Sequence, residues 1–207
     1  MKYIFICCEG ETEEAFVEKL LVPYFKDMGV YIKPIGIRGM SNFDKIKKLI
    51  NRLYLSYPNS LVTTMIDYYG LQKVIPTFIP AEGDIYQRVK LVETKLYEAL
   101  SQKNLYFNIV LHEFEGLLFS DVNAFDGIAT KSQLQELKNI RRRAETPEHI
   151  NDKYETAPSR QILHHIPDYS KIQNGIEVAQ CIGIGKIAEE CIHFGKWIDK
   201  LMDWAKE

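Results

Sequence analysis

The run of residues 3–8, YIFICC, is the feature that most restricts how this chain can fold. Every residue in it is aromatic, β-branched or cysteine, so it lacks the alternation of polar and apolar residues that a half-buried strand shows. Such a run indicates a strand buried on both faces, as in the middle of a parallel α/β sheet. It stops at Glu9-Gly10, where four glutamates fall within six positions. The sequence therefore predicts a central strand that ends on carboxylates.

Strand and helix patterns alternate over the following part of the chain. They predict strands at residues 30–39, 60–67 and 106–114, and helices at residues 13–28, 43–53 and 85–100. Thr12 and Ser41 are the expected N-caps of the first two helices, and Pro34 favours a place at or near an edge for the second strand. Residues 71–84 contain prolines and are expected to form a loop. This order is typical of an α/β fold with a central, mostly parallel sheet of about four strands flanked by helices.

Residues 126–207 show helical patterns with interruptions. Helical segments are expected at SQLQELKNIRRRA, after the start signal Thr146-Pro147-Glu148, and at PSRQILHHIP. An amphipathic segment from Gly183 to Glu207 is expected to dock back onto the sheet. We therefore expect an α/β core over residues 1–125 and a helical C-terminal extension over residues 126–207 that packs on it. With 207 residues, the chain has the length of one structural domain.

The composition restricts the partners and the location of the chain. Its formal net charge is -2, so contacts with nucleic acid have to come from local basic patches rather than a global basic field. No window approaches about 18 uninterrupted apolar residues, and the N-terminus lacks a signal-peptide pattern. These features predict a cytoplasmic protein that does not bind membranes. The four cysteines form no C-x-x-C pair, which favours reduced core thiols over structural zinc.

Acidic residues follow three of the four predicted strands. Glu9 follows the first, Asp67 ends the third, and Glu113 and Glu115 follow the fourth. Ligands of open α/β sheets bind outside the carboxyl ends of the strands, so we expect these acids to converge. Carboxylates suit Mg²⁺, and two such ions can drive an in-line phosphodiester displacement. A plainer alternative for the first group is an acidic helix start, because the helix dipole favours anions there.

Several ordered motifs resemble a known bacterial family. They are CCEGETEEAFVEKLL, MIDYYG, HEFEGLLFSD, PEHIN, APSRQI and CIGIGKIAEECIHFGKWIDKL. Together they cover nearly the whole chain and are similar to a family of uncharacterised proteins assigned to the Toprim-like superfamily. That family is related to the nuclease half of the OLD (overcoming lysogenization defect) proteins. The resemblance implies a compact, Rossmann-like Toprim fold whose acids bind Mg²⁺ or Mn²⁺ for phosphoryl transfer.

The resemblance also implies roles for individual acids. Glu9 matches the glutamate that follows the first Toprim strand, and Glu13 matches the second acid of E-G-x-T-E. Asp67 matches the first aspartate of a D-x-D motif, whereas Tyr69 stands at the second aspartate position. A phenol, with an ordinary pKa of about 10, is a poor Mg²⁺ ligand. Either the HEFE acids complete the metal shell, or the site binds one ion, or it has lost cleavage activity.

The leading hypothesis is a Mg²⁺- or Mn²⁺-dependent nuclease that acts on DNA or RNA in bacterial defence against phages or mobile elements. Glu9, Asp67 and Glu113 are its expected catalytic residues. Gly10 would leave room for a phosphate, and Arg160 and Lys171 would contact the substrate. The predicted metal ligands are Glu9, Glu13, Asp67, Glu113 and Glu115.

Two alternatives from other classes stay open. The chain could be an effector subunit that is active only with an ABC- or AAA-type ATPase, because such ATPases accompany similar Toprim-like proteins and the chain lacks an ATPase motif. It could also be a non-catalytic nucleic-acid-binding module with a decayed metal site, for which Tyr69 is the main argument. Association into a homo-oligomer is left open by the sequence.

Weaker signals have simpler interpretations. His112 could act as a general base, although a histidine at a strand end more often makes a structural hydrogen bond. The run Arg141-Arg142-Arg143 could clamp phosphate or form an exposed helix face. The GIGK segment at residues 183–186 lacks the Walker pattern and is expected to form a turn between two helices.

Overall fold

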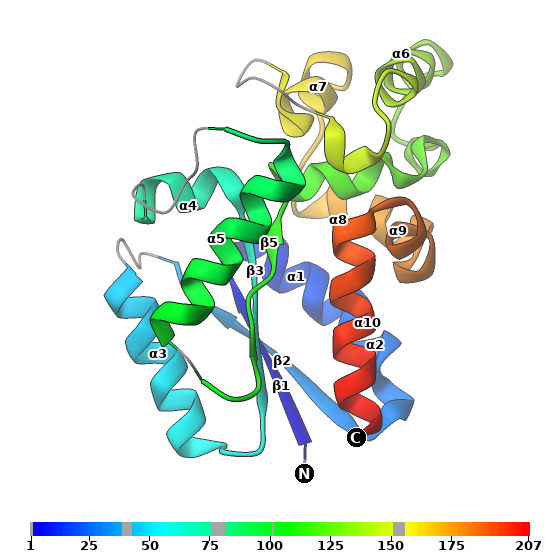
Figure 1. Cartoon of the computed structure of the whole chain (residues 1–207). Helices are drawn as coiled ribbons and strands as arrows, with labels where there is room; N and C mark the ends of the chain where they lie inside the picture. The colour runs from blue at the N-terminus through cyan, green and yellow to red at the C-terminus, as the bar shows by residue number, and fades with distance from the viewer. Residues whose placement is uncertain (1, 39–42, 76–81, 101, 151–155) are drawn as a thin grey trace.

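A parallel sheet in the order β2-β1-β3-β4 runs through the computed structural model (Figure 1). A further short strand, β5, pairs in parallel with the end of β3 beyond β4. The strands are β1 (Lys2–Cys8), β2 (Val30–Gly36), β3 (Leu61–Asp67), β4 (Leu105–Tyr106) and β5 (Ile109–Val110). The structure describes residues 2–38, 43–75, 82–100, 102–150 and 156–207. The predicted α/β class, with a parallel sheet of about four strands and C-terminal helices, is confirmed.

Strand β1 has the central position that its apolar sequence predicts. Its neighbours are β2 and β3, and Cys8 lies opposite both Gly36 and Met65 in the two registers. Side chains alternate between the two faces of the sheet, so Ile4 and Ile6 enter one core and Phe5 enters the other. Strand β2 lies at the edge, as Pro34 predicts, since proline has no N–H to donate to a second neighbour.

Helices cover both faces of the sheet (Figure 1). One core lies on the side of α3 (Phe43–Ser56), α4 (Tyr68–Val74) and α5 (Ile85–Leu100). The helical segment that follows β1 covers part of the other face. It consists of α1 (Glu11–Phe16), the π-helical η1 (Val17–Leu21), α2 (Val22–Tyr24) and the 3-10 turn η2 (Lys26–Met28). Gly29 ends this segment with φ of 70°, a left-handed conformation that favours glycine.

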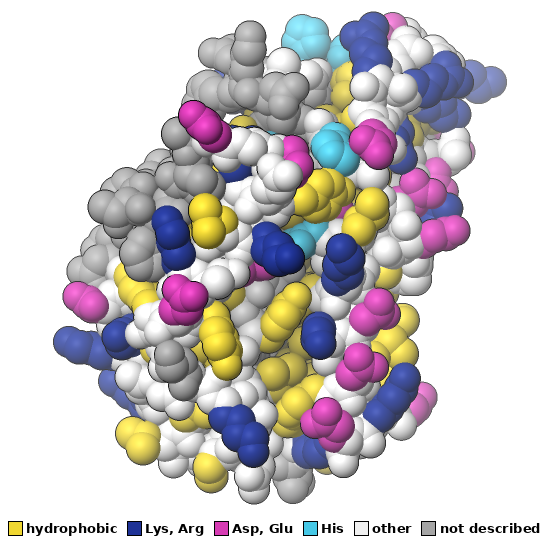
Figure 2. Space-filling view, viewed as in Figure 1, with side chains coloured by type: hydrophobic (Ala, Val, Ile, Leu, Met, Phe, Trp, Pro, Cys, Tyr) yellow, Lys and Arg dark blue, Asp and Glu magenta, His cyan; other side chains and the backbone are white. Residues whose placement is uncertain are grey.

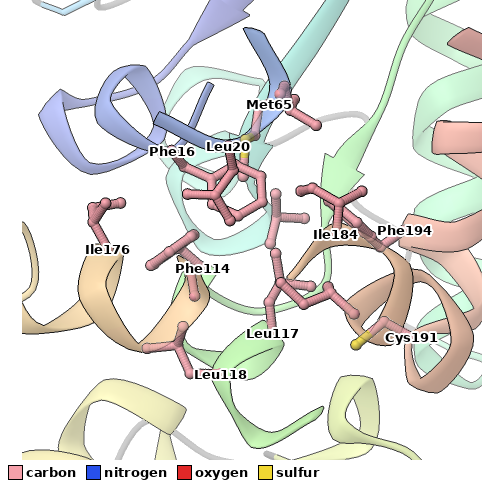
Figure 3. Packing of buried hydrophobic residues seen from close by; sticks show 14 of the residues in the cluster. Phe16, Leu20, Met65, Phe114, Leu117, Leu118, Ile176, Ile184, Cys191 and Phe194 are labelled. Carbon is pink, nitrogen blue, oxygen red and sulfur yellow. The ribbon is translucent and has the colours of Figure 1, made fainter. Parts of the chain in front are cut away.

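The remaining helical elements come from the second half of the chain. They are η4 (Phe114–Ser120), η5 (Val122–Phe125), α6 (Lys131–Arg142), η6 (Pro147–His149), α7 (Pro158–His165), α8 (Gln173–Ile182), α9 (Ile184–Glu190) and α10 (Ile192–Lys206). Figure 3 shows how this half closes the second core. Phe114 and Leu117 of η4, Ile176 of α8 and Phe194 of α10 pack around Phe16. The division at residue 125 into a core and an extension stays a prediction.

Two predictions about the helices are wrong, and a third lies outside the described residues. The first helix begins at Glu11 with Gly10, not Thr12, as its N-cap, because the side chain of Glu13 accepts a hydrogen bond from Gly10 N. Residues 71–74, predicted as loop, belong to α4, which follows directly after the N-cap Asp67. Ser41, the predicted cap of α3, is not among the described residues.

The predicted strand at residues 106–114 is broken into β4 and β5. The break follows from Thr64, whose Oγ1 donates to Asn108 O at 2.8 Å and accepts from Asn108 N at 3.0 Å. A side-chain hydroxyl thus takes both backbone groups of Asn108, and a regular ladder cannot run through that residue. The chain then turns at His112, which has φ of 64°.

Trp197 of α10 ties the end of the chain to the sheet. Its side chain is fully buried, and its Nε1 donates to Oγ1 of Thr63 in β3 at 2.9 Å. The bond satisfies two polar atoms in the core that would otherwise lack partners. No helix within the described ranges is long and apolar enough to cross a membrane.

We expect Trp197→Phe to lower the free energy of unfolding by about 1–3 kcal/mol, because it removes the indole donor and leaves Thr63 Oγ1 unsatisfied. Urea unfolding followed by circular dichroism measures this change. Trp204→Phe is the matched control, since Trp204 lies on the same helix but is only half-buried. Equal losses in the two variants would contradict the role of the Trp197 bond.

Candidate carboxylate site

Five carboxylates meet at the carboxyl end of the sheet. Glu9 directly follows β1, Asp67 ends β3, Glu113 and Glu115 follow β5, and Glu13 lies in the first turn of α1. Their proximity is evident at Asp67, whose pKa is raised well above the ordinary value by burial and by the charges of the other four. We call these five residues the acid cluster. The structure thus places all five predicted metal ligands at the same end of the sheet.

Glu9 is held in place by the start of α4. Its Oε2 accepts a hydrogen bond from the backbone N–H of Asp67 at 2.9 Å. Its carboxylate also lies against the backbone of Gly70, where an added Cβ would be 2.2 Å from Oε1. Gly70 therefore leaves the space that Glu9 occupies. Sequence reasoning missed this role, although the glycine closes the motif MIDYYG.

Glu13 is anchored by the turn that precedes its helix. It is 6% exposed, and its Oε2 accepts from Gly10 N at 2.7 Å. Burial raises the pKa of Glu13, two backbone hydrogen bonds oppose this rise, and the charge of Glu9 adds to it. A Cβ at Gly10 would lie 3.1 Å from the same carboxylate oxygen. Gly10 thus makes room for Glu13, and its contact with substrate stays a prediction.

Asp67 carries a buried oxygen, Oδ1, without a hydrogen-bond donor among the described residues. A buried acceptor without a partner costs about 1–3 kcal/mol, and more when it is charged. The repulsion from the four neighbouring acids adds to this cost. This oxygen therefore lies where a proton or a cation would be stabilising.

Glu113 and Glu115 are fixed by the second half of the chain. Glu113 Oε2 accepts from the backbone N–H of Ser159, in the first turn of α7, at 3.1 Å. Glu115 is 1% exposed, and its Oε1 lies 2.9 Å from Nζ of Lys171. Burial raises the pKa of Glu115 despite this cation. Burial alone would lower the pKa of Lys171, but Glu115, Glu113 and Asp67 raise it, so the ammonium stays protonated.

A strained turn at His112 leads into these two acids. His112 is 4% exposed and adopts a left-handed backbone, which costs a non-glycine residue roughly 1–2 kcal/mol. Its ring lies 5.8 Å from the ring of Tyr69, so the second D-x-D position places an aromatic ring beside His112. Backbone strain of this kind concentrates at functional sites. No feature of the sequence predicted the left-handed backbone at His112.

Other charged residues have structural partners or lie at the surface. Arg38 pairs with Glu11 and, at 3.0 Å, with Glu14, so these two glutamates do more than begin a helix. Arg160 is exposed on α7, next to the Ser159 that donates to Glu113. The ion pair with Glu115 thus places Lys171 at the site, whereas the contact of Arg160 with the substrate stays a prediction.

Two weaker signals also have structural explanations. Arg141 forms an ion pair with Glu190 at 3.0 Å, which favours a structural role for the first arginine of the triple run. Gly183, with φ of 80°, joins α8 to α9. The predicted junction between two helices is therefore confirmed at Gly183, but residues 184–186 of the GIGK segment belong to α9.

The chemistry of the acid cluster fits a hard divalent cation. Its donors are carboxylate oxygens without thiolates, which is the set that Mg²⁺ and Mn²⁺ prefer. The buried Asp67 Oδ1 supplies an acceptor to which no described residue donates. Within the part of the chain that the structure describes, no three His, Cys, Asp or Glu side chains are already arranged around one point as metal ligands.

Comparison with known proteins gives the family. Residues 8–202 match the model of a family described as a domain of unknown function, DUF4276. The chain belongs to the DUF4276 family. No curated protein matches it. A solved structure, the C-terminal region of the OLD protein of Xanthomonas campestris pv. campestris, is similar with 16% sequence identity and a TM-score of 0.38. The similarity covers 96% of this chain and 94% of that one.

Membership of the DUF4276 family confirms the predicted resemblance to an uncharacterised family. The motifs behind that prediction run from CCEGETEEAFVEKLL to CIGIGKIAEECIHFGKWIDKL, and the matched residues span nearly the same range. The finer assignment to the Toprim-like superfamily stays a prediction from those motifs.

The raised pKa of Asp67 makes the stability of the chain depend on pH. Because the folded chain binds this proton more tightly than the unfolded chain, the contribution is fully present below a pH of about 4 and is lost as pH rises from there. We expect Asp67→Asn, which cannot ionise, to unfold at a higher temperature than the wild type at pH 8. The melting temperature of the variant should also fall less between pH 4 and pH 8.

Thermal unfolding at several pH values, without added metal, measures this difference. Asp203→Asn is the matched control, because Asp203 is an exposed aspartate on α10. If the melting temperatures of both variants changed with pH as that of the wild type does, Asp67 would not be the group that makes stability depend on pH.

Proposed function

We propose that this DUF4276 chain is a Mg²⁺- or Mn²⁺-dependent nuclease that hydrolyses phosphodiester bonds of DNA or RNA. The observation that carries the proposal is the buried oxygen of Asp67, which has no hydrogen-bond donor among the described residues and feels the charges of four further carboxylates. A cation bound there would offset both the burial and the repulsion that raise the pKa of Asp67. The Toprim-like motifs of the sequence support the same function independently.

The proposed metal ligands come from the acid cluster, with Glu9, Asp67 and Glu113 closest to the chemistry and Glu13 and Glu115 in support. When bound, the ion supplies a Lewis acid that favours attack of water on phosphorus and stabilises the leaving oxygen. The chain itself supplies rigid positions for the ligands. The backbone N–H of Asp67 orients Glu9, that of Gly10 orients Glu13, and that of Ser159 orients Glu113.

Cations beside the cluster would receive the nucleic acid. Lys171 is 45% exposed, so its ammonium can contact a phosphate oxygen from the solvent side while it stays close to Glu115. Arg160 is exposed on the neighbouring α7 and can form two parallel hydrogen bonds to a phosphate. We propose these two side chains as the phosphate contacts. The proposed setting is bacterial defence against phages or mobile elements, alone or with an ATPase partner.

A second candidate function is a nucleic-acid-binding module that does not cleave. Two observations favour it. Tyr69 replaces the second aspartate of the D-x-D motif, and the described residues hold no ready-made set of three metal ligands. Such a module would use Arg160 and Lys171 in the same way but would not need an ion at Asp67.

Cleavage assays separate the two candidates. We expect the purified chain to cut DNA or RNA with Mg²⁺ or Mn²⁺ and to stop when EDTA removes the metal. Glu9→Gln and Asp67→Asn should each lower the rate by at least about 100-fold, because each removes a proposed ligand. Asp203→Asn serves as the exposed control. Binding without cleavage under any metal, alone or with the neighbouring ATPase, would instead support the non-catalytic module.

Gly70 offers a test that leaves the carboxylates unchanged. In Gly70→Ala the new Cβ would overlap the Glu9 carboxylate, so Glu9 has to move. Alanine favours a helix by about 1 kcal/mol over glycine, and Gly70 lies within α4. We therefore expect a stable protein whose cleavage rate falls by about 10–100-fold, the usual effect of disturbing a ligand's support.

Gly185→Ala is the matched control for Gly70→Ala. Gly185 also lies in a helix, α9, but an added Cβ there would meet nothing within 4 Å. Its cleavage rate should equal that of the wild type. A fully active Gly70→Ala variant would show that the position of Glu9 does not matter for the reaction.

A further inference from the structure

The carboxylate of Glu115 is deeply buried, whereas the lysine that pairs with it, Lys171, lies at the surface. Glu115 is 1% exposed, whereas the side chain of Lys171 is 45% exposed, and their charged atoms lie 2.9 Å apart. An exposed lysine can turn towards a phosphate, because its ammonium sits on a flexible stem. If Lys171 did so, Glu115 would lose its ion-pair partner. A buried carboxylate without a partner is strongly destabilising, so the chain needs a second donor for Glu115.

Tyr169 has a donor that no described residue uses. It is 6% exposed, and its buried hydroxyl forms no hydrogen bond within the part of the chain that the structure describes. A buried tyrosine usually finds an acceptor for this group. Tyr169 also lies only two residues before Lys171, so the two donors approach the acid cluster from the same short segment.

The surroundings of the Tyr169 hydroxyl point to the acid cluster. The oxygen lies against Gly175 of α8, where an added Cβ would be only 2.6 Å away, so the glycine leaves space for it. Helix α8 packs on η4, the element that carries Glu115. Consistent with this placement, the charges that act on the phenol are those of Glu115 and Glu113.

We propose that Tyr169 is a positioning residue that takes over Glu115 when Lys171 turns to a phosphate of the substrate. In the free protein, Lys171 holds the carboxylate and the tyrosine hydroxyl has no hydrogen-bond partner among the described residues. When the phosphate draws the ammonium away, the hydroxyl donates to Glu115 and keeps it in place. The substrate class in this proposal rests on the proposed function, but the exchange of donors is a property of the chain itself.

An unfolding cycle tests the exchange without any substrate. In the wild-type background, Tyr169→Phe removes an unpaired hydroxyl, so the melting temperature should stay unchanged or rise. In a Lys171→Met background the proposed exchange has the hydroxyl donate to Glu115, so Tyr169→Phe should lower the melting temperature by about 2–4 °C. Lys171→Gln provides a second background should the methionine variant not fold. Tyr31→Phe, at a tyrosine that is 54% exposed, should have the same effect in every background.

Effects of Tyr169→Phe with the same sign and size in both backgrounds would overturn the proposal. The kinetics of substrate cleavage add a second measurement, because a merely structural role of Tyr169 would not change KM separately from kcat. Tyr169→Phe should raise KM about tenfold with kcat retained, and it should add nothing once Lys171 is methionine, because no exchange is then needed. If the wild type cleaves no nucleic acid, the proposed function fails, while the unfolding cycle still decides whether Tyr169 takes over Glu115.

Discussion

Repulsion between carboxylates that are held out of water is the interaction on which the rest of this structure depends. Parallel strands end at one edge of the sheet, so acids placed after β1, β3 and β5 are forced together whatever their distance in sequence. Left alone, like charges at this depth would separate or become protonated. Backbone N–H groups oppose that tendency by fixing three of the carboxylates, which are Glu9, Glu13 and Glu113.

The two apolar cores supply the rigidity that such a site requires. Strand β1 sends alternate side chains into both, so Glu9 is carried by a strand that cannot shift without disturbing either core. Strand β3 is fixed on one side by the bond between Thr63 and Trp197 and on the other by the bonds between Thr64 and Asn108. The strand ends are therefore positioned by packing, and the loops beyond them need only orient the side chains.

Much of this arrangement could be predicted from the sequence, and the failures have physical causes. The apolar run of β1, the edge position from Pro34 and the helix at Ile85–Leu100 were readable because each depends on local pattern alone. The break at Asn108 was not, because it depends on the Thr64 side chain from another strand. The same holds for Gly70 and Tyr169, whose roles come from contacts across the fold rather than from neighbouring residues.

The bond between Trp197 and Thr63 also has a consequence for the order of folding. It joins residues that are 134 positions apart, and the pair of Glu115 and Lys171 likewise waits for the second half of the chain. Contacts this distant in sequence form late, because a long loop has to close before they yield any stabilisation. During synthesis, β1 and β3 emerge long before Trp197 does. The acids that follow β1 and β3 therefore gain Glu115 and Lys171 as neighbours only after the second half of the chain has been made, so the complete site depends on both halves.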